Sequence, residues 1–206
     1  MPDATAVHNQ PETFADDGVV WHRPTLDNPA ATPMPFAGFS LPLCTLAPHG
    51  LTLLCYQSDW GREWSPRYER LCDHPEGFSI QVTAGRSGHG WQPYLLVQEQ
   101  SGTLHAFCAL CSGNWGFSVS AMGEVALFQT ADMLRGTLSA GETLSLPQAL
   151  HARGNSGANA LFQHLHAFLK AHVLPSGRVP AGLVEWNHWW RYEDEEITEA
   201  IFLQNA

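Results

Sequence analysis

The sequence predicts a mostly β protein whose main part is an antiparallel β-sandwich, followed by a helix and one strand–turn–helix unit. Between Val19 and Leu150, short apolar or alternating runs are separated by Gly, Pro, Ser and Asp, a pattern typical of sandwiches. From Asn155, apolar residues recur at helical spacing. After Pro180, a short apolar run leads into an acidic helix start. These three patterns divide the chain into its expected parts.

The sandwich domain is expected over residues 18–154. Its strands are separated by turn signals such as Pro48-His49-Gly50 and Met122-Gly123. Residues 1–17 are polar and rich in Ala, Asp and Pro, so we interpret them as an N-terminal tail or an early edge segment. The expected strands are Val19–Trp21, Leu41–Leu46, Leu51–Gln57, Phe78–Thr83, Tyr94–Gln98, Thr103–Leu110, Gly116–Ala121, Val125–Gln129 and Thr143–Leu150.

A linker helix is expected over residues 155–177. Asn155 or Ser156 can cap its first turn, and Leu174-Pro175-Ser176-Gly177 ends it. The apolar residues at helical spacing are Ala158, Leu161, Phe162, Leu165, Phe168, Leu169 and Val173. Three histidines of this helix, His164, His166 and His172, are too scattered around its axis to bind one metal ion and are expected at or near the surface.

Residues 178–206 are expected to form a strand, a turn and a helix. The apolar run after Pro180 indicates a buried strand, and Asp194-Glu195-Glu196 suits a helix start, with Asp194 as the candidate N-cap. The acids therefore have a helix-dipole explanation that needs no catalytic role. Large rings crowd the turn between strand and helix: Trp186, His188, Trp189, Trp190 and Tyr192. They suit stacking on the C–H face of a sugar, or alternatively a core cluster at a domain junction.

A second aromatic stretch, Asp59–Arg67, mixes tryptophans with arginines. Such a mixture favours sugar stacking together with hydrogen bonds to hydroxyl groups. The alternative is a sandwich corner in which Arg62 or Arg67 pairs with Glu63.

Composition excludes several classes of function and partner. The formal net charge of -10 argues against nucleic acid as a partner. No window is apolar enough to span a bilayer, and Met1–Asp17 contains no apolar signal-peptide core. The five cysteines are an odd number, which indicates reduced thiols in the cytoplasm. Cys108 and Cys111 have metal-site spacing, but residues three apart on a strand face opposite sides of its sheet, so we expect packing roles.

Four segments resemble glycoside hydrolase family 36, the melibiase-type α-galactosidases, in that family's order. Val179–Trp189 resembles the first strand of its catalytic barrel. Gly85–Val97 resembles its Gly/Ser/His-rich segment and the strand that follows, His105–Trp115 the next strand with its Ser-Gly-Asn-aromatic end, and Leu138–Pro147 its later Gly-Glu strand. The resemblance runs from about Leu41 to the end of the chain.

The resemblance implies a supersandwich, a linker helix and an incomplete (β/α)8 barrel, since a whole barrel needs about 250 residues and one βα unit follows the helix. The chain would then be the N-terminal part of a retaining α-galactosidase that acts on small α-galactosides. The family's two catalytic aspartates would lie beyond Ala206, so this chain alone is expected to be inactive. No catalytic residue, cofactor or metal is assigned, and a homo-oligomer without nucleic-acid or membrane partners is expected.

Substrate-wall roles are assigned by the resemblance to Trp189, Asn187, His188, Trp190, Trp60, Arg62 and Trp64. Three alternatives stay open. Two belong to the same superfamily: an α-N-acetylgalactosaminidase and a galactosyltransferase of the raffinose-synthase type. The third is a non-catalytic β-sandwich module that binds carbohydrate.

Overall fold

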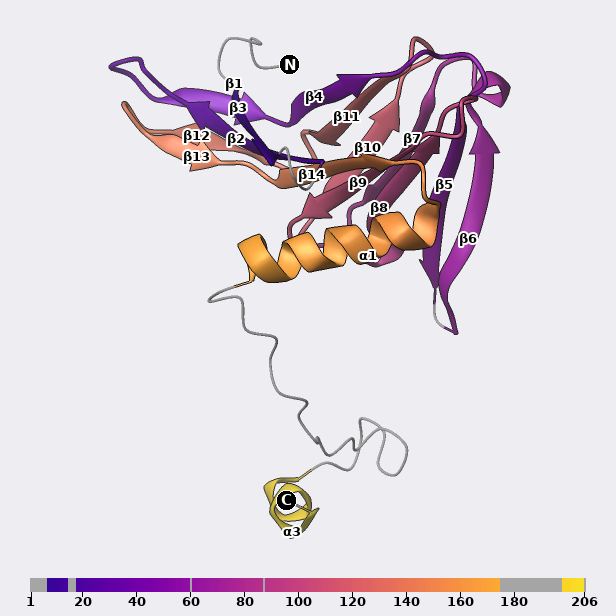
Figure 1. Cartoon of the computed structure of the whole chain (residues 1–206). Coiled ribbons are helices and arrows are strands. Elements are labelled where there is room, and N and C mark those ends of the chain that lie inside the picture. Colours follow the sequence, from indigo (N-terminus) through magenta and orange to yellow (C-terminus); the bar gives the residue numbers. More distant parts are fainter. Residues whose placement is uncertain (1–6, 15–17, 60, 87, 175–197, 206) are drawn as a thin grey trace. The chain divides into compact units, whose positions relative to one another are not determined.

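The computed structural model describes residues 7–14, 18–59, 61–86, 88–174 and 198–205. The chain divides into two compact units, Met1–Phe168 and Leu169–Ala206. The first is a β-sandwich carrying one helix (Figure 1), which confirms the predicted mostly-β class. The predicted barrel strand near residues 182–186 and the aromatic turn after it lie outside the described residues.

The first unit contains the strands β1 to β14. Their bounds are β1 Val7–Phe14, β2 Val19–Asp27, β3 Met34–Ala37, β4 Phe39–Thr45, β5 Thr52–Asp59, β6 Arg62–Arg70, β7 Phe78–Val82, β8 Gly90–Gln98, β9 Leu104–Leu110, β10 Trp115–Val119, β11 Glu124–Gln129, β12 Arg135–Leu138, β13 Thr143–Ser145 and β14 Gln148–Gly154. A 3-10 turn, η1 Leu71–Asp73, follows β6.

Within the described residues the strands form three antiparallel sheets. The eight-stranded sheet has the order β1-β2-β14-β9-β8-β5-β6, with β13 also paired to β2. The four-stranded sheet has the order β4-β11-β10-β7, and β12 pairs with β3 in a two-stranded ribbon. Figure 1 shows the two larger sheets as the layers of the sandwich. Since β6 is at one edge of the larger sheet and β1 at the other, both have one side unpaired among the described strands.

Several strands were not predicted from the sequence, and the structure shows why their hydrophobic pattern is weak. β1 is mostly exposed and lies at the sheet edge, which is the edge-segment alternative for residues 1–17. β6 is exposed along most of its length and contains Pro66, so no apolar alternation marks it. In the β3–β12 ribbon, Gly136 lies opposite Phe36, and a Cβ there would come within 2.9 Å of the Phe36 ring.

The predicted strand Thr143–Leu150 is two strands instead, β13 and β14. Pro147 stands between them and has no amide hydrogen to give to a ladder. The amide of Leu146 donates to the carbonyl of Pro24 over 3.0 Å, so the chain stays attached to β2 through the break.

The core lies between the two larger sheets and is dense in aromatic rings. Trp115 and Phe117 of β10 and Phe107 of β9 are fully buried. The ring centroids of Phe107 and Phe117 are 6.4 Å apart and join the two sheets. Buried leucines from β4, β5 and β8 extend this cluster. Burial of such rings dominates core energetics, so this contact fixes how the sheets face each other.

The helix α1, Ala158–Phe168, packs on the outer face of the larger sheet against β9 and β14. Its buried residues Leu161, Leu165 and Phe168 follow the predicted helical spacing. The Phe168 ring lies 4.8 Å from that of Phe14 and 6.2 Å from that of Trp21. This aromatic contact fastens the C-terminal end of α1 to strands β1 and β2.

The second unit begins with the π-helical turn η2, Leu169–Val173. The predicted helical run is therefore present, but its last turn differs in hydrogen bonding: the Leu174 amide donates to the Leu169 carbonyl over 2.9 Å. Later in this unit, α3 spans Glu199–Asn205. The Thr198 hydroxyl accepts a hydrogen bond from the Ile201 amide over 3.3 Å and caps the described helix. The candidate cap Asp194 lies outside the described residues.

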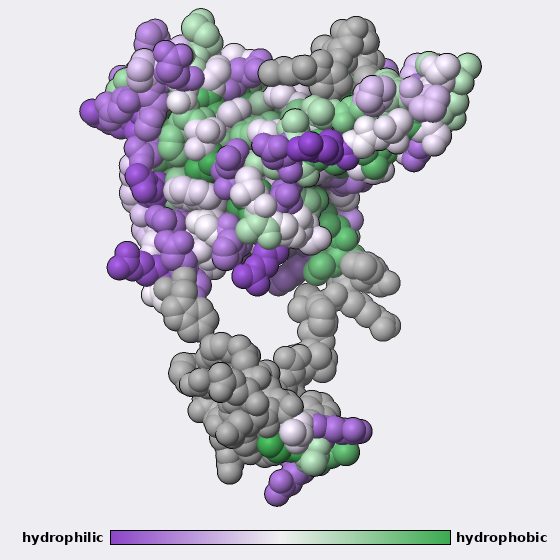
Figure 2. Space-filling view, turned by 180° about the vertical axis from the view of Figure 1, so that it is seen from behind, coloured by the Kyte–Doolittle hydropathy of each residue, from purple (hydrophilic) through white to green (hydrophobic). Residues whose placement is uncertain are grey.

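The side of the sandwich opposite α1 is seen in Figure 2. Hydrophilic residues are spread over it, with hydrophobic ones visible between them, as is usual for an antiparallel sheet with one solvated face. In the described part of the chain, helices with the length and apolarity to cross a bilayer are absent.

Candidate functional site

The β5–β6 hairpin carries the described residues of the predicted sugar-contact stretch. The stretch Asp59–Arg67 is not a sandwich corner, because nearly all of it belongs to these two paired strands. The strand register shifts between Gln57 and Asp59. In the same region Trp64 adopts a φ of +61°, a left-handed conformation that costs a non-glycine residue about 1–2 kcal/mol. Bulges of this kind turn a side chain to a new direction and are common beside functional sites.

Trp64 is supported by a cluster of aromatic rings on the outer face of the sheet. Its ring centroid lies 5.5 Å from that of Tyr56 on β5 and 5.8 Å from that of Tyr94 on β8. Phe162 of α1 in turn packs 6.1 Å from Tyr56 and 5.4 Å from Tyr94. Trp64 nevertheless stays 49% exposed. The rings therefore hold one face of the indole and leave the rest available to a ligand.

Burial affects the two tyrosines of this cluster. It raises the pKa of the Tyr56 hydroxyl, with a smaller contribution from Tyr68. It also raises the pKa of Tyr94, where Cys108 adds to the effect. Both hydroxyls are therefore protonated at neutral pH, and the rings of Trp64, Tyr56, Tyr94 and Phe162 form an uncharged cluster.

The ion pairs of the hairpin differ from those predicted. Arg67 pairs with Glu69 over 2.9 Å rather than with Glu63, and the Glu63 carboxylate accepts a hydrogen bond from the Gly61 amide over 3.2 Å. The Arg67 pairing lowers the pKa of Glu69. Among the described residues, the Arg62 guanidinium makes no ion pair, so its donors are available to hydroxyl or carboxylate groups of a ligand.

The Gly/Ser/His-rich segment lies beside the hairpin. Gln92 donates to the Ser58 hydroxyl over 3.0 Å, and Gly90 pairs with Ser58 across the β5–β8 ladder. Arg86 and His89 approach each other within 3.3 Å in the same loop. The Gly85 amide donates to Asn114 over 2.7 Å. Three sequence segments that carry the family resemblance or the sugar prediction thus converge at one end of the sandwich.

Most of the other predicted wall residues belong to the C-terminal segment. Trp60, Asn187, His188, Trp189 and Trp190 lie outside the described residues, as do the acids Glu193–Glu196. Of the predicted set, Arg62 and Trp64 are described, and both belong to β6. Sequence reasoning missed the supporting roles of Tyr56 and Tyr94, although each lies in an expected strand. Phe162 was assigned to the apolar face of the helix, where it meets these rings.

No metal site is found in the part of the chain that the structure describes: no group of three or more His, Cys, Asp or Glu side chains could hold an ion. Cys108 is buried within β9, and burial raises its pKa to about 12. Cys111, half-buried after the strand end, also has its pKa raised by burial. These properties suit packing, as predicted for the CxxC pair. Of the helix histidines, His164 is half-buried while His166 and His172 are exposed, also as predicted.

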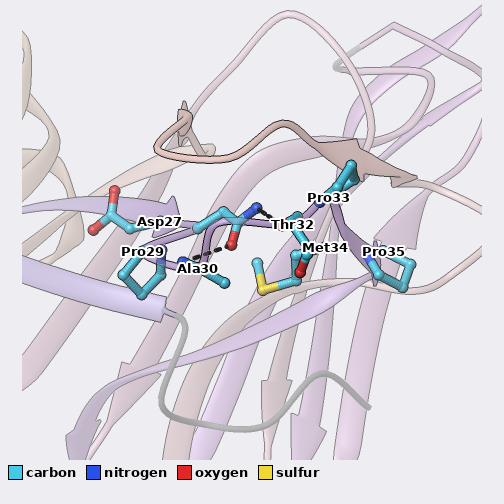
Figure 3. Close-up of a pocket in the computed structure, with 8 residues that line it drawn as sticks. Asp27, Pro29, Ala30, Thr32, Pro33, Met34 and Pro35 are labelled. Carbon is cyan, nitrogen blue, oxygen red and sulfur yellow. Dashed lines mark hydrogen bonds between the residues drawn. The ribbon is translucent and has the colours of Figure 1, made fainter.

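A hollow of about 400 Å³ lies in the β2–β3 connection, and Figure 3 shows its lining. Its central residue, Asn28, is buried. The Asn28 amide nitrogen lies 2.9–3.0 Å from the carbonyls of Thr32, Leu138 and Ser139, and its oxygen accepts from the Ala30 amide. These bonds occupy the Asn28 side chain. We therefore interpret Asn28 as a residue that stabilises this loop, whose lining also contains prolines and Met34, and not as part of a polar ligand site.

Comparisons with known proteins give a match for the fold of this chain but not for its sequence. Neither the protein-family models nor the curated proteins give a match to the sequence. Solved structures do match: an α-galactosidase from Lactobacillus brevis has a TM-score of 0.65 with 18% identity over 80% of this chain. The family 36 enzyme AgaA from Geobacillus stearothermophilus, in complex with stachyose, has a TM-score of 0.67 with 16% identity over 82%. The galactosidase domain of the α-galactosidase–sucrose kinase AgaSK has a TM-score of 0.65 with 17% identity over 82%.

The fold is the one these α-galactosidases share. The match covers 23% of the Lactobacillus chain and 25% of the other two. This chain therefore spans about a quarter of the length of the enzymes it resembles.

Proposed function

We propose that this chain provides the β-sandwich domain of a retaining α-galactosidase that removes terminal α-linked galactose from small oligosaccharides. The observation that carries the proposal is the agreement in fold over 80–82% of the chain with α-galactosidases of family 36. The order of the four resembling sequence segments supports it independently. Two of the matched structures contain stachyose or raffinose, so a neutral α-galactoside is the proposed substrate class.

In the proposed enzyme, the β5–β6 hairpin forms part of the substrate wall. Trp64 would supply an exposed ring for stacking on a sugar, and Arg62 would supply hydrogen-bond donors. Trp60, Asn187, His188, Trp189 and Trp190 complete the proposed wall. The sandwich is assigned to residues 18–154, the linker helix to 155–177 and the start of a barrel to 178–206. No catalytic carboxylate is assigned to this chain.

The proposal includes an assembly and a location. In a homo-oligomer, the hairpin of one subunit would approach the active site of a neighbour, as the family resemblance implies. The cytoplasm is the proposed compartment, which the five free cysteines support.

A non-catalytic carbohydrate-binding module is the second candidate. The specific observation in its favour is that Trp64, supported from below by Tyr56 and Tyr94, stays half exposed on the sandwich itself. Such a platform can bind sugar without any barrel.

The test is an assay of the complete gene product that contains residues 1–206. We expect it to hydrolyse nitrophenyl α-galactoside and to release galactose first as the α-anomer, because a retaining enzyme uses two successive displacements. Preference for the matching α-N-acetylgalactosaminide, or transfer of galactose to sucrose in place of hydrolysis, would assign the protein to the alternative activities. Binding of raffinose without turnover of any of these substrates would favour the module.

A further inference from the structure

A second surface feature lies on the outer face of the eight-stranded sheet, beside the first turn of α1. It is a groove of about 270 Å³ formed by β5, β6, β8, β9 and the start of the helix. Its volume is below the roughly 300–1,000 Å³ of sites for drug-sized ligands. A ligand of one or two sugar rings would therefore suit the groove better than a larger molecule.

The strand register explains how the groove is built. One cross-strand row places Tyr68 of β6 opposite Leu54 of β5, which in turn lies opposite Leu96 of β8. The next row on the same face pairs Thr52 of β5 with Gln98 of β8. In an antiparallel pair of strands, side chains that lie directly opposite each other on one face are close enough to be in contact. The floor is thus apolar, and the polar groups lie together at one side.

The chemistry of the lining is uncharged throughout. The eight residues that line the groove are neutral, although the chain as a whole carries a net charge of -10, and Arg70, which lies opposite Thr52 on β6, is paired with Asp73 over 2.9 Å. Tyr68 is 68% exposed, so its ring is available for stacking. The Gln98 amide and Thr52 hydroxyl each offer both a donor and an acceptor. Gly157 and Ala158 bring the first turn of α1 to the rim, where helix amides lack partners within the helix.

We propose that this groove is a carbohydrate-binding site that takes a neutral mono- or disaccharide. The Tyr68 ring stacks on the C–H face of a sugar ring, while Gln98 and Thr52 exchange hydrogen bonds with its hydroxyl groups. An uncharged ligand with alternating apolar and hydroxyl surface complements a lining of this composition. A charged ligand would find no counter-ion among the described lining residues.

The groove is separate from the β5–β6 hairpin site. Tyr68 and Trp64 are four residues apart on β6, a separation of up to about 13 Å along the strand. A monosaccharide stacked on one ring does not reach the other. The proposal therefore does not depend on the proposed catalytic function, since a surface site of this kind would bind sugar with or without hydrolysis.

The experiment is a titration of the 206-residue chain, followed by amide NMR shifts, with methyl α-galactoside and with raffinose as probes. We expect saturable shifts at Thr52, Tyr68, Gln98 and Gly157. Tyr68→Ala should weaken this binding at least tenfold, while Tyr68→Phe, which keeps the ring, should stay within about threefold of the native affinity. Because Tyr68 is exposed, neither change should alter the melting temperature by more than about 2 °C.

Two controls make the result decisive. Trp64→Gly removes the hairpin ring and should leave the shifts at the groove unchanged, whatever it does at the hairpin. A dilution series without sugar tests whether a second copy of the chain occupies the groove. Shifts confined to the residues around Trp64, absence of saturable shifts with both probes, or shifts that follow protein concentration instead of sugar would each overturn the proposal.

Discussion

The Nδ1 atom of His105 lies 3.0 Å from the Nε2 atom of His151 inside the sandwich. The Nε2 atom of His105 lies 2.7 Å from a carboxylate oxygen of Glu99. Since that carboxylate accepts, His105 donates from Nε2, which leaves its Nδ1 to accept from the Nε2–H of His151. The His151 ring also stacks on Phe107, with centroids 4.5 Å apart. His151 is thus held as a neutral donor among rings.

This arrangement predicts loss of stability in acid. Burial, with smaller contributions from His105, His22 and Arg153, lowers the pKa of His151 to about 3, and burial also lowers the pKa of His22. Between about pH 3 and pH 6.5 the unfolded chain therefore binds more protons than the folded one, so the free energy of unfolding falls as pH falls. We expect His151 alone to contribute a loss of about 2 kcal/mol between pH 7 and pH 5, measured by urea unfolding.

The control is a pair of variants. His151→Gln keeps a donor toward His105 but cannot be protonated, so the loss of stability toward pH 5 should become smaller even if the variant is less stable at pH 8. His49→Gln changes a residue on the β4–β5 turn and should stay within about 0.5 kcal/mol of the native protein at pH 8. An unchanged pH dependence in His151→Gln would show that His151 does not carry the effect.

The strained backbone of Trp64 predicts a separation of function from stability. Trp64→Gly removes the exposed ring, but glycine adopts positive φ without penalty, so the melting temperature should hardly change. If the ring contacts sugar in the active enzyme, its loss forfeits about 1–3 kcal/mol, or roughly ten- to a hundredfold in kcat/KM for an α-galactoside. Trp64→Phe should lose less. An early melt with normal kcat/KM would make Trp64 a structural residue.

The thiols should react in two classes. All five cysteines are free. Burial raises the pKa of Cys44 and of Cys55 to about 11 and that of Cys108 to about 12, and reactivity requires the thiolate. Cys72 is exposed. A disulfide reagent should therefore modify one thiol rapidly in the native protein and all five after denaturation, and Cys72→Ser should abolish the rapid phase. More than one rapid equivalent would contradict this burial pattern.

The parts of the fold that could be predicted from sequence are those with buried periodic side chains. The strands from Leu41 to Gln129 that face the core alternate or run apolar, and α1 shows Leu161, Leu165 and Phe168 at helical spacing. The strands β1, β6 and β12 could not be found in this way, because they are largely exposed and long-range pairing, not side-chain burial, decides their conformation.

The candidate site was predicted in part for a similar reason. Tryptophans and arginines in Asp59–Arg67 indicated sugar contact, but no local pattern indicated that Trp64 rests on Tyr56 and Tyr94. That contact depends on the order β6-β5-β8 in the sheet and on a bulge, and neither is visible in local composition. The partner predicted for Arg67 was wrong. Glu69 is two residues away and shares a face of the strand with Arg67, whereas the bulge at Trp64 lies between Arg67 and Glu63.

The turn between β10 and β11 gives a final prediction about backbone packing. Gly123 has a φ of +82°, and a Cβ at this position would lie 2.1 Å from the Leu46 carbonyl oxygen. The same neighbourhood contains a hydrogen bond, because the Leu46 amide donates to the Gly123 carbonyl over 3.0 Å. Any side chain at residue 123 must therefore displace the end of β4 as well as adopt an unfavourable φ.

The matched control is Gly102, in the β8–β9 turn, which has a φ of +90° and where an added Cβ would meet nothing within 4 Å. Gly102→Ala should cost only the conformational penalty, about 1–2 kcal/mol. Gly123→Ala should cost a further 1–3 kcal/mol or so, roughly the usual range for forcing an extra carbon into packed structure. Urea unfolding of both variants measures the difference directly. Equal losses would show that the β10–β11 turn can move away from β4, and that the contact with Leu46 does not constrain the sandwich.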